Sequence, residues 1–237
     1  MTFIKQLTID FEKSTLIDLT HIINADIPAW EEGCAFDNNI TLDYSDSTKS
    51  VPFRVQSFHM RAGIGTHMDA PAHCIPNGKT IDQIAIHDLI KPCVAIDISE
   101  KSDAHYLLSV NDVISFENKY GKISANSFVI VHTSWSRYWN NPTQYRNQLQ
   151  FPSVSVDAAE FLLKRNIAGL GIDTLSPDTE KSGFPVHQLL LSSGKIIIEN
   201  MNNTDRLKPV GAYLIALPIN VSGATESPVR VIALQNT

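Results

Sequence analysis

The sequence predicts a single mixed α/β domain. Several apolar runs are rich in β-branched residues and too short for helices, which is typical of strands. One strong helical pattern leads directly into such a run, whereas other runs follow one another with no helix between them. A chain of 237 residues with scattered glycine and proline and no linker-like stretch fits one domain with a substantial core, spanning residues 1–237.

The expected strands are short apolar runs. They cover residues 14–19, 93–98, 127–132, 167–172, 195–198, 212–216 and 229–233. No internal repeat and no low-complexity tract interrupts them.

Three helices are expected between these strands. Residues 109–120 carry apolar side chains at helical spacing, with a polar first turn. Residues 155–166 form the stronger pattern, and either Ser155 or Asp157 is suited to cap it. A third, shorter helix is expected at residues 184–191.

The composition excludes several classes of protein. A formal net charge of −6 and no basic run argue against nucleic-acid binding. No apolar stretch approaches the roughly 18 residues of a membrane span, and the first eleven residues do not resemble a signal peptide. Cys34, Cys74 and Cys93 lack a Cys-x-x-Cys spacing, which suits free thiols in a reducing compartment. We therefore expect a cytoplasmic protein without nucleic-acid or membrane partners.

The segment most suggestive of chemistry is residues 65–73, which read GTHMDAPAH. Histidine and carboxylate are standard ligands of zinc and manganese. His67 and Asp69 are two residues apart, so an extended backbone would place both side chains on one face of a strand. Pro71 would then turn the chain, so that His73 could move a proton rather than bind the metal. A histidine close to an aspartate is usually only hydrogen-bonded to it. The prediction of a metal site therefore rests on the whole segment 65–73 and not on His67 and Asp69 alone.

The string resembles the signature His-x-Gly-Thr-His-x-Asp-x-Pro-x-His of the Putative cyclase family, which includes bacterial kynurenine formamidase and isatin hydrolase. Similar segments extend over roughly residues 14–234. They are residues 16–21, 27–30, 131–135, 171–178, 186–187, 198–200, 214–218 and 227–230. The resemblance implies the swivelling β/β/α fold of that family and assembly into homodimers or homotetramers.

The resemblance also implies a set of site residues. The metal ligands would be His67, Asp69, His187 and Glu199, holding zinc or manganese, and Asp69 could bridge two ions. His73 would be the catalytic general acid and base. The candidate substrate-binding residues are Trp30, as an aromatic wall, and Phe36; Phe36, Trp135 and Trp139 could instead line an interface.

One position departs from the signature. Its first histidine, a metal ligand in the family, aligns with Gly63. His59 lies four residues away, about 13 Å along a strand, and would need a bulge to reach. Cys74 is a second conceivable ligand, although an inert thiol is the simpler interpretation. Alternatively, water or substrate fills the place, and His67, Asp69 and Glu199 hold a single metal.

The predicted function is metal-dependent hydrolysis of a small amide, formamide or lactam. The metal would activate a water, and His73 would take its proton and pass one to the leaving amine. By analogy, the leading reaction is arylformamidase-like, N-formylkynurenine to kynurenine and formate in tryptophan catabolism. The substitution at Gly63 leaves two alternatives open: a non-catalytic relative that only binds a small molecule, or a cyclase or dehydratase.

Overall fold

The computed structural model describes residues 13–33, 36–46 and 50–236. Seven strands close into a barrel in the order β12-β11-β5-β7-β9-β10-β4, because β4 pairs both with β10 and with β12. An eighth strand, β1, pairs with the other end of β12. The strands are β1 (Ser14–Asp18), β4 (His67–Asp69), β5 (Ile90–Asp97), β7 (Phe128–His132), β9 (Gly169–Ile172), β10 (Ile196–Glu199), β11 (Ala212–Pro218) and β12 (Glu226–Asn236).

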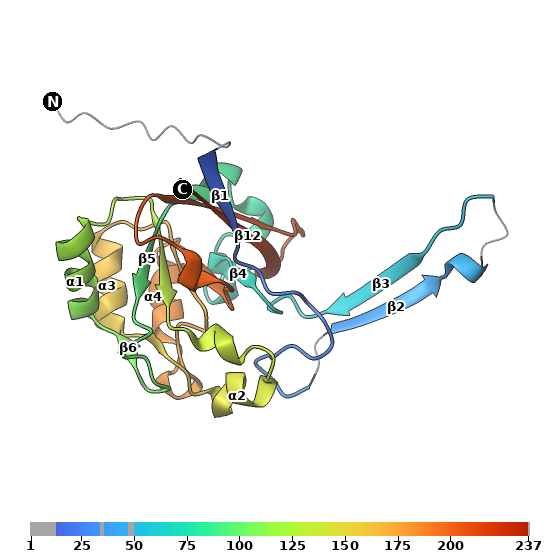
Figure 1. The fold of residues 1–237 in the computed structure, drawn as a ribbon, viewed down its shortest axis with the longest axis horizontal. Helices are drawn as coiled ribbons and strands as arrows, with labels where there is room; N and C mark the ends of the chain where they lie inside the picture. Colours follow the sequence, from blue (N-terminus) through green and yellow to red (C-terminus); the bar gives the residue numbers. More distant parts are fainter. Residues whose placement is uncertain (1–12, 34–35, 47–49, 237) are drawn as a thin grey trace.

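The barrel combines parallel and antiparallel pairing. β5, β7, β9 and β10 run parallel to one another, whereas β11, β12 and β4 join them antiparallel. The parallel strands are connected through helices, as parallel pairing requires. These are α1 (Val110–Tyr120), α2 (Pro142–Arg146), α3 (Val156–Lys164) and α4 (Pro185–Ser192). α1, α3 and α4 pack in one layer against the parallel strands (Figure 1).

Side chains of the parallel strands alternate between two apolar cores. In β7, Phe128 and Ile130 point into the barrel, while Val129 and Val131 pack under the helices. Strands buried on both faces read as continuous apolar runs, and this is why they are so clear in the sequence. The mixed α/β architecture is confirmed, and the swivelling arrangement implied by the resemblance stays a prediction.

All the predicted strands and helices are present, with ends shifted by a few residues. Ser109 begins α1 by a reciprocal capping box with Asp112. Ser155 rather than Asp157 caps α3, since its hydroxyl accepts the backbone N–H of Ala158. β12 extends well beyond the predicted residues 229–233.

A hairpin that the sequence did not indicate projects from the body of the molecule (Figure 1). It consists of β2 (Phe36–Leu42) and β3 (Val55–Met60), paired antiparallel. Most of its side chains are exposed, including Ile40 at 50% and Phe58 at 60%. Two short strands, β6 (Leu107–Leu108) and β8 (Ser153–Val154), form a separate parallel pair. Among the described residues, no helix has the length and apolar character needed to cross a membrane.

Candidate metal centre

The candidate centre lies where β4 runs between β10 and β12. Glu199 of β10 stands opposite His67, and Glu226 of β12 stands opposite Asp69. Directly opposed residues of an antiparallel pair share a face, as do residues two apart on one strand. The register therefore puts all four side chains on the same face, while Met68 points from the other face into the barrel core.

The N-terminus of α4 brings His187 to this face. Asp178 lies eight residues upstream of Val186, and its carboxylate accepts the backbone N–H groups of Val186 and His187 at 3.2 and 2.9 Å. The same carboxylate lies 2.8 Å from Nδ1 of the His187 ring. The ring therefore donates from Nδ1 to Asp178 and presents Nε2 to the centre.

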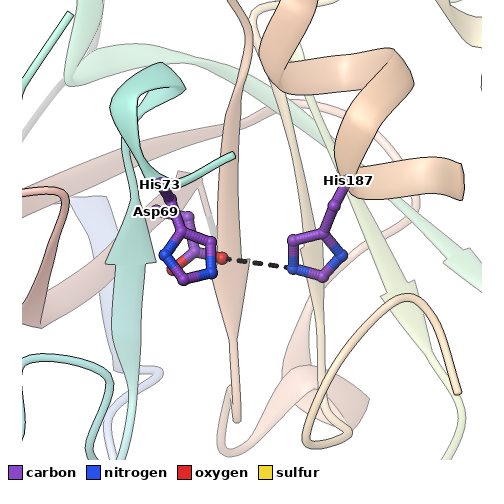
Figure 2. A group of neighbouring side chains, drawn as sticks. All are labelled: Asp69, His73 and His187. Carbon is purple, nitrogen blue, oxygen red and sulfur yellow. Dashed lines mark ion pairs between the residues drawn. The ribbon is translucent and has the colours of Figure 1, made fainter. Parts of the chain in front are cut away.

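His73 reaches the centre from a 3-10 turn, Pro71–His73, that follows β4. Proline at the start of this turn ends the strand and folds the chain back, as its sequence position predicted. Figure 2 shows Asp69 and His73 on one side of the centre and His187 across from them on α4. The rings of His73 and His187 lie 6.0 Å apart between centroids.

These side chains form two overlapping groups of candidate ligands. His67, Asp69 and Glu199 make one group, Asp69, His73 and His187 make the other, and within each group the ligand atoms lie within 4.8 Å of one another. Glu199 stands between two histidines, with Oε2 3.3 Å from Nε2 of His67 and Oε1 3.2 Å from Nε2 of His187. Asp69 belongs to both groups, so a cation in either place would have this carboxylate within reach.

The donor set fits a divalent cation. Both carboxylate oxygens of Asp69 and Oε1 of Glu199 are buried, and no group in the described residues donates a hydrogen bond to them. Buried anionic oxygens without a partner are costly, so they indicate a positive charge between them. His67 also donates from Nδ1, to the carbonyl of Gly65 at 2.9 Å, and presents Nε2. Imidazole and carboxylate groups oriented in this way are suited to bind a divalent metal ion.

Protonation of the histidines is the alternative way to compensate the negative charge of these carboxylates. Burial opposes the charged form of His67, but Glu199 and Asp69 outweigh it and raise its pKa to about 10. Burial likewise opposes a charge on His187, yet the hydrogen bond to Asp178 and the nearby carboxylates of Asp69 and Glu199 raise its pKa. The two histidines in turn overcome burial at Glu199 and lower its pKa to about 2. A cation therefore competes with protons for this centre.

The centre opens into a cavity of about 400 Å³. Trp30 and Phe184 form an aromatic wall, with ring centroids 5.5 Å apart. Trp30 thus borders the cavity beside the centre, and its contact with a substrate stays a prediction. Phe36 does not line this cavity; it contacts Phe58 in the hairpin, with ring centroids 5.8 Å apart.

Trp135 and Trp139, the other predicted lining residues, are buried in an apolar cluster and do not line the cavity. Their exposed fractions are only 6% and 7%, so within this chain they serve packing.

The structure shows which side chains lie near Gly63, where the family signature has a histidine. His59 lies on β3 in the exposed hairpin, opposite Asp37, and does not line the cavity. Cys74 does line the cavity but belongs to neither ligand group, and burial raises the pKa of its thiol. Glu226, which no pattern in the sequence indicated, occupies the space: a Cβ added at Gly63 would lie 2.6 Å from its Oε1.

Fold and site together define a mixed α/β protein with a buried histidine–carboxylate centre beside an aromatic-walled cavity. The chain belongs to the Putative cyclase family, whose sequence model matches residues 17–179. It is 32% identical over 186 residues to an isatin hydrolase of Roseibium aggregatum, covering 72% of this chain and 70% of that protein. It is 27% identical over 227 residues to a kynurenine formamidase of Bacillus thuringiensis subsp. konkukian, covering 92% and 97%.

Solved structures of isatin hydrolases are also similar to this chain. Isatin hydrolase A from Labrenzia aggregata, bound to benzyl benzoate, superimposes with a TM-score of 0.86 at 28% identity, covering 95% of each chain. Isatin hydrolase A from Ralstonia solanacearum superimposes with a TM-score of 0.85 at 27% identity, covering 95% of this chain and 93% of that one. The barrel and its helical layer are therefore the fold of these proteins.

Proposed function

We propose that the protein is a metal-dependent hydrolase that cleaves a C–N bond of a small aromatic amide, formamide or lactam. The observation that carries this proposal is the buried centre with unpaired carboxylate oxygens at the base of a cavity walled by Trp30 and Phe184. His67, Asp69, His187 and Glu199 would hold the metal, which we propose to be zinc or manganese. When bound, the cation would supply Lewis acidity for a water and for the substrate carbonyl.

We assign the general acid and base role to His73. Its side chain is 32% exposed, whereas those of His67 and His187 are 6% exposed. A histidine that borders both the cavity and the ligand groups can take a proton from the attacking water and return one to the leaving nitrogen. The buried histidines, whose Nδ1 atoms are already hydrogen-bonded, suit a fixed ligand role.

Two substrates represent the proposed class. N-formylkynurenine is the candidate that follows from the likeness to kynurenine formamidases, and its products would be kynurenine and formate. Isatin, a cyclic amide, is the second candidate, supported by the 32% identity to an isatin hydrolase and by the isatin hydrolase structures. In both molecules an aromatic ring adjoins the C–N bond that is broken, so stacking against Trp30 would serve either one.

The test compares hydrolysis of N-formylkynurenine and isatin by the wild type, His73→Ala and Asp69→Asn, with metal content measured on each protein. We expect the wild type to contain a divalent metal and to hydrolyse at least one substrate. Each variant should lose about 100-fold or more in kcat/KM. His59→Ala, on the exposed hairpin, is the matched control and should retain activity.

Wild-type rates in both site variants would contradict the assignment. Binding of either compound without turnover by the wild type would favour the non-catalytic alternative. A cyclised or dehydrated product would favour the changed chemistry, and analysis of the products distinguishes it from hydrolysis.

We further propose that the protein assembles as a homodimer or homotetramer in the cytoplasm. The projecting hairpin supports assembly, because Ile40, Phe53 and Phe58 are each at least half exposed on it. Cys74 and Cys93 are free thiols, which supports a reducing compartment.

A further inference from the structure

We infer that Glu226 is a metal ligand that takes the place of the side chain absent at Gly63. The inference rests on the proposed metal site and concerns how this chain completes it. Neither the signature string nor the resemblance draws attention to Glu226, which immediately precedes the segment 227–230 at the start of β12.

The first support is the position of the carboxylate. An added Cβ at Gly63 would lie 2.6 Å from Oε1, 3.2 Å from Cδ and 3.4 Å from Oε2 of Glu226. The whole carboxylate thus occupies the volume into which a side chain at position 63 would project. Gly63 and Glu226 both border the cavity, so this volume is part of the candidate centre. A histidine at position 63 and the present position of Glu226 exclude each other.

The second support is the strand register. Glu226 pairs with Asp69 across β12 and β4, and directly opposed residues project on the same face. Asp69 offers two buried oxygens that accept no hydrogen bond from the described residues. The backbone of Glu226 is therefore anchored beside the one carboxylate that both ligand groups share.

The third support is the reach of the side chain. Oε1 of Glu226 lies 3.4 Å from Nδ1 of His73, which itself belongs to a ligand group, although Glu226 as placed belongs to neither group. Its side chain is 22% exposed and ends at the cavity, and we expect a bound cation to draw the carboxylate from His73 toward Asp69 through a change of rotamer.

The exchange of an imidazole for a carboxylate changes the chemistry of the centre. It adds a negative charge and replaces a nitrogen donor by a harder oxygen donor. Imidazole suits zinc, whereas carboxylates suit manganese and magnesium. The centre of this protein should therefore favour Mn²⁺ over Zn²⁺ more than the same centre with a histidine at position 63.

The test measures dissociation constants for Mn²⁺ and Zn²⁺ on the chelator-stripped full chain, by competition with a chromophoric chelator. Glu226→Gln and Glu226→Ala should weaken Mn²⁺ binding about tenfold or more and Zn²⁺ binding less. The double variant Gly63→His/Glu226→Gly should regain tight binding with a preference for Zn²⁺. Glu31→Gln is the matched control, since Glu31 borders the same cavity but pairs with Arg61. Thermal melting of each stripped variant verifies that it is folded.

Three results would overturn the inference. The first is wild-type affinity for both ions in Glu226→Gln and Glu226→Ala. The second is a changed pH profile of hydrolysis in Glu226→Gln with metal affinity intact, which would make Glu226 a positioning partner of His73. The third is a wild type that binds neither ion, and that result alone would also refute the proposed metal-dependent function.

Discussion

Oδ2 of Asp178 lies 2.8 Å from Nδ1 of His187 and also accepts the backbone N–H of the same residue. One carboxylate thus begins α4 and fixes the tautomer of the ring. With Nδ1 occupied, Nε2 lies 3.6 Å from Asp69 and 3.2 Å from Glu199. Asp178 is 2% exposed and holds the ring from behind without facing the cavity itself.

Replacing Asp178 by asparagine should therefore weaken metal binding without removing a ligand. The asparagine side chain would retain one oxygen for the backbone N–H groups but lose the charge that stabilises the orientation of the ring. We expect metal affinity to fall by about 10- to 100-fold, as for other partners of metal-binding histidines. Calorimetric titration with Mn²⁺ measures the change. Ser182→Ala removes a hydroxyl that donates to the carbonyl of Thr179 at 2.7 Å and lies 3.4 Å from Asp178, so it should bind metal like the wild type.

Metal binding should release protons. The pKa of His67 is raised to about 10 and that of His187 is raised too, so both rings are protonated at pH 7 before a cation binds. Coordination requires neutral nitrogen, so both protons must leave. Apparent affinity should therefore increase with pH as far as about pH 10. Titration calorimetry in two buffers of different ionisation enthalpy measures the protons released, and a heat independent of buffer would contradict this prediction.

Gly169→Ala should destabilise the barrel more than Gly171→Ala. A Cβ at Gly169 would lie 2.5 Å from the backbone oxygen of Ile196, which is held in the neighbouring strand β10, and 2.5 Å from the Phe128 ring. At Gly171 the closest atoms are the ends of the Met201 and Ile130 side chains, at 2.5 and 2.6 Å, which can rotate. We expect Gly169→Ala to cost about 1–3 kcal/mol, measured by urea unfolding. Equal costs at the two positions would show that the backbone contact relaxes.

The Glu117–Arg165 ion pair joins α1 to α3 and should contribute stability that depends on pH. Two hydrogen bonds of 2.7 and 2.9 Å from Arg165 hold the pKa of Glu117 below its ordinary value. Because the pKa of Glu117 is lower in the folded than in the unfolded protein, the ion pair stabilises the fold at pH values above the unfolded pKa of about 4.3. This contribution disappears as the pH falls through the folded pKa. Glu117→Gln keeps an acceptor for the N–H of Ile123 but removes the charge. It should cost about 1 kcal/mol at pH 7.

Urea unfolding of both proteins from pH 7 to well below the unfolded pKa of about 4.3 verifies this. The difference between the wild type and Glu117→Gln should shrink at the acid end. A constant difference would assign the effect to packing and not to charge.

Phe58→Asp should disrupt the proposed assembly. Phe58 is 60% exposed on the projecting hairpin, and a buried aspartate in an interface between copies would be strongly unfavourable. We expect a shift to a smaller species in light scattering coupled to size-exclusion chromatography. Ser57→Asp adds the same charge to the adjacent, exposed position and serves as the comparison. A monomeric wild type would refute the assembly itself.

The sequence predicted those parts of the fold and site that depend only on residues close together in the chain. β7 and β9 are continuous apolar runs because both of their faces are buried. His67 and Asp69 could be placed on one face from the two-residue period alone. The hairpin was missed because strand β2 contains Asp37, Asn38 and Asn39, which do not alternate with apolar residues.

The remaining site residues depend on contacts between distant segments. His187 and Glu199 were identified only through the family resemblance, since either could have been an ordinary buried or solvated residue. Glu226 required the register of β12 against β4, and β4 has only three residues, too few for a pattern to show its partners. Asp178 lies inside the family-like segment 171–178, but its role, to accept the backbone N–H of His187 at the start of α4, could be seen only in the structure.

The three residues of β4 have hydrogen-bonded neighbours on both edges, β10 on one side and β12 on the other. Because of this double pairing, the centre depends on the last strand, β12, as much as on residues 65–73. Until β12 is in place, β4 lacks one of its two neighbours, and Asp69 lacks its partner Glu226. Ion binding should therefore report completed barrel closure, and a folding intermediate with an open barrel should be unable to retain the ion.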